Sequence, residues 1–264
     1  MTEVEYPLLQ DEWVAEESEP GLLTVERAAY VAIGLLAAGL RLFQLGLRPL
    51  GEGEAVQALA ALRFVEGVPQ VPAGTVPALF TGNVLGFTAM GTSDITARWL
   101  PALVGLILVL LPYGLRHRLG RGGAVAASLL LAISPSLVYY SRSLDSAILV
   151  AACGLALAVG LLNYLDTRRP AFLYMGAVAL GLGLTSGPGF YSLLLILILF
   201  ALLLFVAERL LGQGVGWSSL AVGWSAVRGE QGLLAKTGAV LAATFGLVAM
   251  TFVLNPSGVG HAAD

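Results

Sequence analysis

Seven runs of apolar residues, each about as long as a bilayer is thick, constrain the fold of this chain more than any other feature. A helix needs about 20 mostly apolar residues to cross the hydrocarbon core of a membrane. The composition agrees, because 57% of the residues are hydrophobic and only 12% are charged, against roughly 25% charged in a soluble domain. The sequence therefore predicts an all-α integral membrane protein with about seven transmembrane helices. We place them near residues 26–45, 97–115, 122–140, 146–165, 171–186, 189–208 and 237–254.

The first 24 residues differ from everything that follows. They contain no Lys or Arg, and their acidic residues are Glu3, Glu5, Asp11, Glu12, Glu16, Glu17 and Glu19. A signal peptide would begin with basic residues followed at once by an apolar core. We therefore expect residues 1–24 to be a solvated, disordered cytoplasmic tail, with docking on a basic partner as the alternative. Residues 25–264 then form the transmembrane domain.

Basic residues in the short loops predict the orientation of the chain, because Lys and Arg accumulate on the cytoplasmic side. Basic segments occur at 116–121, at 166–170 and around the loop 209–236. They alternate with loops around residue 142 and at 185–189 that carry few charges. The pattern predicts a multi-pass plasma-membrane protein whose N-terminus is cytoplasmic and whose C-terminus lies outside.

That topology makes residues 46–96 one long external loop. Within it, 54–67 has apolar residues at helical spacing, and 76–91 is apolar but short, with two interior glycines. We predict that both form helices lying in the membrane interface. The alternative, in which 76–91 crosses the membrane, would invert every later loop. The cytoplasmic loop 209–236 holds two tryptophans seven residues apart, which predicts a further amphipathic interfacial helix.

Polar residues collect in three clusters at the predicted external ends of the helices, where they can share one cavity. A carboxylate there suits a general base or a ligand of a divalent cation. An arginine there suits a phosphate, which its guanidinium binds with two parallel hydrogen bonds. The alternative is structural, since charged residues at helix ends snorkel and tyrosines form interfacial belts. The clusters are Arg41, Arg48, Glu52 and Glu54; Asp94 and Arg98; and Tyr139, Tyr140, Arg142 and Asp145.

Three segments carry a resemblance to a known family: "RLFQLGLRPLGEGEAVQAL", "SDITARWLPALVGLILVLLPYGLRHRLGRGGAVAASLLLAISPSLVYYSRS" and the terminal "NPSG". They are similar to the GT-C superfamily of polyprenyl-phosphate-sugar-dependent glycosyltransferases, which includes the protein O-mannosyltransferases. Within it, the chain looks most like the bacterial and archaeal flippase activity-associated proteins. The resemblance implies the N-terminal half of a GT-C-like fold, with interfacial helices in the first outer loop. An active member would transfer a sugar on the outer face from a polyprenyl-phosphate donor, with a divalent cation as a further expected component.

The acidic motif of this chain departs from the family pattern. The first loop of family members usually reads Asp-Glu-Ala, with the Asp as the expected base or metal-associated acid. Glu54 and Ala55 match, but the Asp position falls on Gly53, which has no side chain. If the chain is active, Glu54 or Glu52 is the candidate base. Its candidate donor phosphate ligands are Arg142, Arg98 and Tyr140.

Two further positions also differ. The His that often follows the motif in relatives falls on Gln57, and an Arg and an Asp of the third cluster fall on Asp145 and Ala147. Relatives also run to roughly twice this length. These departures favour a degenerate, non-catalytic protein that serves as a scaffold or accessory subunit of a larger membrane complex. The alternative is an active glycosyltransferase of the hexosyl- or mannosyltransferase class.

Other partners and cofactors have less support from the sequence. We expect membrane lipid and other membrane subunits as partners. Nucleic acid is not expected, since no basic stripe interleaved with aromatic residues is present. Cys153 is the only cysteine, which excludes an intrachain disulfide and a thiol-based metal site.

Overall fold

The computed structural model describes residues 25–68, 74–211, 217–229 and 232–252. The acidic tail and the terminal "NPSG" motif lie outside the described residues. Within the described ranges every regular element is a helix and none is a strand, which confirms the all-α class. The helices are α1 Val25–Leu42, α2 Glu52–Val65, α3 Pro77–Met90, α4 Asp94–Leu110, the 3-10 helix η1 Leu111–Leu115, α5 Arg116–Ile133, α6 Pro135–Ser141, α7 Ala147–Thr167, α8 Pro170–Leu184, α9 Pro188–Leu211, α10 Trp217–Gly229 and α11 Leu233–Ala249.

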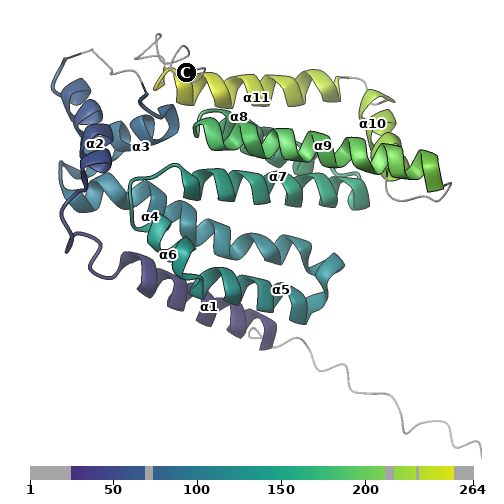
Figure 1. Cartoon of the computed structure of the whole chain (residues 1–264), viewed down its shortest axis with the longest axis horizontal. Coiled ribbons are helices and arrows are strands. Elements are labelled where there is room, and N and C mark those ends of the chain that lie inside the picture. The colour runs from purple at the N-terminus through teal and green to yellow at the C-terminus, as the bar shows by residue number, and fades with distance from the viewer. Residues whose placement is uncertain (1–24, 69–73, 212–216, 230–231, 253–264) are drawn as a thin grey trace, which may run out of the picture.

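The long helices lie side by side as a bundle with two distinct ends (Figure 1). One end carries α2 and α3 together with the chain segments 42–51, 142–146 and 185–187, and we call it the α2–α3 end. The opposite end carries the segments 116–121 and 167–170 and helix α10, and we call it the basic end. The predicted external and cytoplasmic loops are therefore sorted to opposite ends of the bundle.

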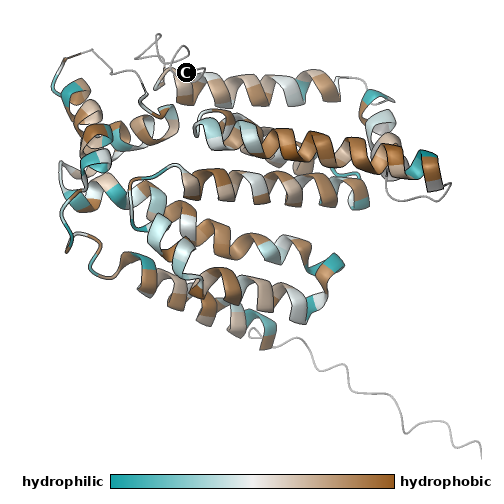
Figure 2. Cartoon of the chain, viewed as in Figure 1, coloured by the Kyte–Doolittle hydropathy of each residue, from teal (hydrophilic) through white to brown (hydrophobic). Residues whose placement is uncertain are grey.

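The two ends differ in charge. Among the described residues, the basic end carries nine Lys or Arg and three acidic residues, whereas the α2–α3 end carries five of each. Hydropathy follows the same division, because the middle of the bundle is apolar and the hydrophilic residues gather toward its ends (Figure 2).

Three helical segments among the described residues are long and apolar enough to cross a membrane: Asp94–Ile133, Ala147–Thr167 and Pro188–Leu210. A bent pair, Ala221–Gly229 with Leu233–Ala249, makes a fourth if it is counted as one crossing. Each of the seven predicted runs coincides with a helix or helix pair, but seven separate crossings stay a prediction.

The 40-residue segment Asp94–Ile133 is a hairpin rather than one straight helix. Gly120 has φ +74° and ψ 162°, which breaks the helical path within α5. A glycine adopts this conformation without the steric cost that a Cβ would bring. α5 therefore turns back and packs against α4 and α1. The predicted run 122–140 is broken again where α5 ends and Pro135 begins α6.

Helix α3 is the most enclosed element at the α2–α3 end. Ten of its 14 residues are buried, and it packs against α2, α4 and α11. Its interior glycines make the contact with α4 possible, since a Cβ at Gly82 would overlap Leu100 and one at Gly86 would overlap Trp99. α3 thereby holds the first turns of α4 in place, including Arg98. The placement of α2 and α3 in a membrane interface stays a prediction.

Candidate functional site

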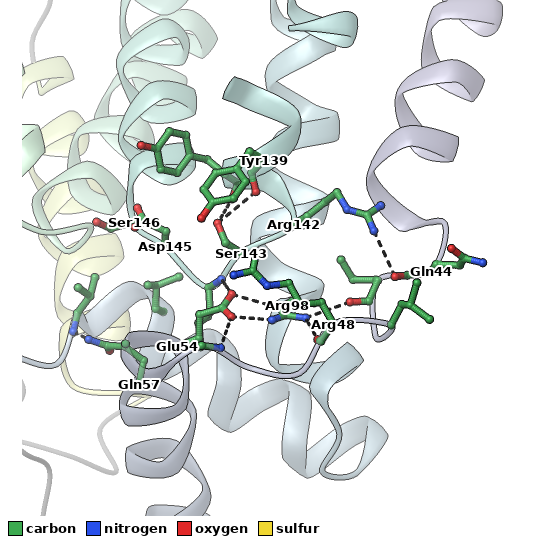
Figure 3. Close-up of a pocket in the computed structure, with 18 residues that line it drawn as sticks. Gln44, Arg48, Glu54, Gln57, Arg98, Tyr139, Arg142, Ser143, Asp145 and Ser146 are labelled. Carbon is green, nitrogen blue, oxygen red and sulfur yellow. Dashed lines mark hydrogen bonds and ion pairs between the residues drawn. The ribbon is translucent and has the colours of Figure 1, made fainter. Parts of the chain in front are cut away.

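A cavity of about 720 Å³ lies at the α2–α3 end of the bundle (Figure 3). Its lining comes from the segment after α1, from α2, from the start of α3, from Arg98 of α4, and from α6 with the stretch that joins it to α7. All three polar clusters that the sequence predicted to meet contribute to it. The residues that line it include Arg48, Gly53, Glu54, Gln57, Arg98, Tyr139, Tyr140, Arg142 and Asp145.

The carboxylate of Glu54 is fully occupied by hydrogen bonds. Oε1 accepts from Arg98 Nε at 3.2 Å and from the Leu144 N–H at 2.7 Å. Oε2 accepts from Arg98 Nη2 at 2.6 Å and from the Gly51 N–H at 2.8 Å. A carboxylate offers about four acceptor sites, so this group has none left for a substrate. The Gly51 contact follows from local sequence, because a Glu at the third helical position commonly reaches back to the residue that caps the helix.

Arg98 is equally committed. Beyond its two bonds to Glu54, its guanidinium donates to the carbonyl oxygens of Leu45 at 3.2 Å, Arg48 at 2.7 Å and Pro49 at 3.2 Å. These bonds account for all five N–H donors of an arginine. The residue is only 2% exposed. Arg98 therefore joins α4, α2 and the segment after α1, and it has no donor left for a phosphate.

The pKa of Glu54 reflects this arrangement. Burial alone would raise the pKa of the carboxyl group, but the hydrogen bonds from Arg98, Gly51 and Leu144 and the charge of Arg98 outweigh burial and lower it below its ordinary value. A general base works best with a pKa near the working pH. Glu54 is thus a weak base held in a structural role, which we call the Glu54 clamp.

Gly53 lines the cavity, and no atom lies within 4 Å of the position that a Cβ would occupy there. The position at which the resemblance predicts an Asp is therefore open space rather than space filled by another side chain. Glu52 is exposed and does not line the cavity. The structure brings Glu54 into the cavity and leaves Glu52 outside it.

The third cluster is held against the end of α1. Arg142 donates from Nη1 to the carbonyl oxygens of Leu40 at 2.9 Å and Phe43 at 2.8 Å, and from Nη2 to that of Gln44 at 3.2 Å. Cations and donors near a helix C-terminus satisfy its last carbonyl groups. Arg142 thus fixes the end of α1.

Tyr139 and Tyr140 line the cavity and contact each other edge to face, with ring centroids 5.4 Å apart. Gln57, at the position of the family His, donates to the Gly74 carbonyl at 3.3 Å and accepts from the Val76 N–H at 3.2 Å. It therefore ties α2 to the start of α3.

Arg41, from the first cluster, lies outside the cavity. Its side chain is fully buried and donates to the carbonyl oxygens of Ala132 at 3.1 Å and Leu131 at 3.0 Å and to the hydroxyl of Ser141 at 3.2 Å. It forms no ion pair among the described residues. This arginine binds the C-terminal end of α5.

Two charged residues in the cavity were not selected as site residues from the sequence. Arg48 is exposed, and its guanidinium makes no hydrogen bond or ion pair within the described part of the chain. Asp145 uses Oδ1 to accept from the Ala147 N–H at 2.7 Å; for Oδ2 the described residues supply no partner. The sequence signal was their place in the first and third polar clusters, where neither was given a role. Only the fold shows that both residues face the cavity.

The described side chains of the cavity do not build a divalent-cation site by themselves. No group of three His, Cys, Asp or Glu side chains comes together among the described residues. Glu54 has no lone pair available, which leaves Asp145 as the one carboxylate in the cavity with a free oxygen. Ca²⁺ takes six to eight oxygen ligands, and Mg²⁺ is held by one or two carboxylates together with waters and phosphate oxygens.

A protein-family comparison identifies the middle of the chain. The sequence model of the dolichyl-phosphate-mannose-protein mannosyltransferase family matches residues 77–228, more than half of the 264 residues. The chain belongs to this family. The match supports the GT-C resemblance. The matched region includes Arg98 and the third polar cluster. It begins after α2, so Gly53 and Glu54 lie outside the matched region. No curated protein and no solved structure matches the chain.

Proposed function

We propose that this member of the mannosyltransferase family does not transfer sugar and instead acts as an accessory subunit of a larger membrane complex. The observation that carries the proposal is the Glu54 clamp. The carboxylate that the motif retains is saturated by four hydrogen bonds. Beside it, the position of the expected acid is Gly53. The motif carboxylate that lines the cavity therefore holds the walls of the cavity together instead of acting on a substrate.

The basic end lies on the cytoplasmic side of the plasma membrane in this proposal, and the cavity faces outward. The excess of basic residues at that end supports the orientation, since Lys and Arg near membrane-spanning helices favour the cytoplasm. Reaction of single cysteines placed at Arg169 and Glu66 with an impermeant maleimide on intact cells tests the orientation. Labelling of the Glu66 position alone is expected, and labelling of the Arg169 position alone contradicts it.

Donor consumption tests the loss of activity. Purified full-length protein is reconstituted in vesicles with radiolabelled polyprenyl-phosphate mannose, and release of sugar is compared with that in protein-free vesicles. We expect no release above the protein-free level from the wild type. Release above that level, lost in a cavity variant and kept in Glu52→Gln, would overturn the proposal.

Stoichiometric association tests the accessory role. The chain is extracted in a mild detergent and its mass is determined by size-exclusion chromatography with light scattering. We expect a defined complex with at least one other membrane protein in fixed ratio. A chain that runs alone in several mild detergents contradicts the accessory part of the proposal.

A second candidate function is sugar transfer with Asp145 as the base. The free Oδ2 of Asp145 in the cavity favours it. Asp145 would take the proton of an acceptor hydroxyl as that oxygen bonds to the anomeric carbon. The bond from that carbon to the phosphate would break, and Arg48 would stabilise the polyprenyl phosphate that leaves. Sugar release that is lost in Asp145→Asn and kept in Glu52→Gln would establish this alternative.

A further inference from the structure

A second, almost wholly apolar cavity of about 410 Å³ runs along the bundle away from the polar cavity. We call it the apolar groove. α3 borders the groove at one side. One wall is α4 from Leu100 onward with Leu111 of η1, and the other is α8 from Met175 to Leu182. α7 packs on both helices and supplies the floor with Ala152, Cys153 and Ala156. Two of these three helices belong to segments that are long and apolar enough to cross a membrane. The groove therefore lies at membrane depth.

The few polar atoms in the lining are already satisfied. The Thr81 hydroxyl donates to the Val248 carbonyl at 2.7 Å, and the Ser186 hydroxyl donates to the Leu182 carbonyl at 2.7 Å. These hydroxyl groups therefore do not need a polar group of a ligand as a hydrogen-bond partner. The occupant that satisfies this surface is a hydrocarbon.

The dimensions distinguish a hydrocarbon chain from a protein helix. Eleven residues of α4 at about 1.5 Å each give a length of roughly 16 Å, which is about half of a 30 Å hydrocarbon core and thus one leaflet. A helix about 10 Å wide would need on the order of 1200 Å³ over that length, far more than the groove holds. A hydrocarbon chain with a contact width of about 4 Å needs roughly 200–300 Å³ and fits.

The occupant is separate from any ligand of the polar cavity. The two cavities share no lining residue. Between them the start of α3 is pinned to the end of α8 by the Ala78 N–H, which donates to the Thr185 carbonyl at 3.0 Å. A chain in the groove would have to cross this wall to carry a headgroup in the polar cavity.

We propose that the apolar groove binds one acyl chain of a bilayer phospholipid from the leaflet at the α2–α3 end. The lipid fills the space between α4 and α8 and completes the packing around α7. The site is independent of the proposed function, since it shares no residue with the polar cavity.

Photo-cross-linking tests this site. The full chain is reconstituted in phosphatidylcholine nanodiscs that contain a trace of phosphatidylcholine with a diazirine in the middle of one acyl chain. Adducts are mapped by mass spectrometry. We expect at least a five-fold enrichment of adducts on the groove residues of α4, α7 and α8 over the exposed apolar face of α9, which any diffusing lipid contacts. Equal labelling of the two surfaces would overturn the proposal.

Two variants separate the groove from general lipid contact. Ala156→Trp fills the floor of the groove, and Ala201→Trp makes the same change on α9. We expect Ala156→Trp alone to remove most groove adducts while α9 adducts persist. If Ala156→Trp does not fold, Ala179→Leu fills the wall with a smaller side chain. Groove adducts that survive every filler that folds contradict the proposal.

Competition identifies the source of the chain. Unlabelled polyprenyl phosphate at a few per cent of the lipid is expected to leave them unchanged. Loss of groove adducts at that low level would show an isoprenoid occupant and overturn the assignment to a phospholipid.

Discussion

Two arginine–carboxylate pairs of nearly the same geometry stand at opposite ends of the bundle. At the α2–α3 end, Arg98 contacts Glu54 at 2.6 and 3.2 Å. At the basic end, Arg118 contacts Asp166 at 2.7 and 2.8 Å. The first pair has side chains 3% and 15% exposed, and the second has side chains 43% and 41% exposed.

The comparison shows that surroundings, rather than pair geometry, decide what such a pair does. Arg98 and Glu54 also bind five backbone groups from two segments, 42–51 and 142–146. Removing one partner of a buried pair leaves an uncompensated charge and costs far more than removing one at the surface. An arginine–carboxylate pair therefore holds the walls of a cavity together at one end and lies on an exposed surface at the other.

Arg98→Leu should give the largest loss of stability. It leaves the buried Glu54 carboxylate without its cationic partner and three carbonyl groups without donors, so we expect the free energy of unfolding to fall by about 4 kcal/mol. Thermal unfolding in detergent checks this, with Arg118→Leu as the matched control. Similar losses in both variants would break the comparison.

Glu54→Gln should cost about 3 kcal/mol, because the amide keeps the shape but sets an N–H₂ donor against the donors of Arg98 or Leu144. The double variant Arg98→Leu/Glu54→Leu sharpens the result. We expect it to lose less stability than the sum of its single changes, since neither charge is left alone. Strict additivity would mean that the two groups act independently.

The clamp should also weaken in acid. The pKa of Glu54 is lowered in the folded chain, so its stabilisation is present above the ordinary carboxyl pKa of about 4.3. It is lost as the pH falls through the lower folded value. Melting temperature is measured from pH 6 to pH 3 in the wild type and in Glu54→Gln. The difference between the two proteins should shrink at the acid end, and a constant difference would contradict the assignment.

Asp166→Asn should have the smallest effect, about 0.5 kcal/mol or less, because exposed pairs gain little from attraction that water and salt screen. Melting temperatures in low salt and in 0.5 M salt, where the Debye length is roughly 4 Å, test this. A loss of stability of several kcal/mol, or a loss that persists at high salt, would mean that the exposed pair contributes as much as the buried pair and would contradict the comparison.

The sequence predicts where the helices of this chain begin and end better than it predicts how they pack against one another. Apolar runs locate α7, α8 and α9 within a few residues because period and length are local properties. The turn at Gly120 and the burial of α3 depend on partners distant in the chain. Gly82 and Gly86 look like reasons for a weak helix, and only packing against Trp99 and Leu100 shows why they are there.

The same limit applies to the site. The sequence predicts that the three clusters of Glu54, Arg98 and Arg142 can share one external cavity, and the fold brings all three residues to one cavity. The sequence cannot show that the acceptor sites of Glu54 and the donors of Arg98 are all used. The hydrogen bonds that use them join residues 44 and 90 positions apart in the chain. Arg48 and Asp145 remain available to bind a ligand in the cavity. Only the hydrogen bonds of the folded structure distinguish them from the charged residues that are already fully bonded.

Arg41 has a consequence for how the chain is made. Its acceptors at Leu131 and Ala132 lie 90 and 91 residues further along the chain. A ribosome that adds about 5–20 residues per second takes roughly 5–20 s to reach them. During that interval the cation on α1 has no partner beyond the Ala37 carbonyl of its own helix, and its position near the helix end allows it to reach water. The arrival of α5 then removes that cation from water and draws the first helix into the bundle, so the order of synthesis becomes an order of assembly.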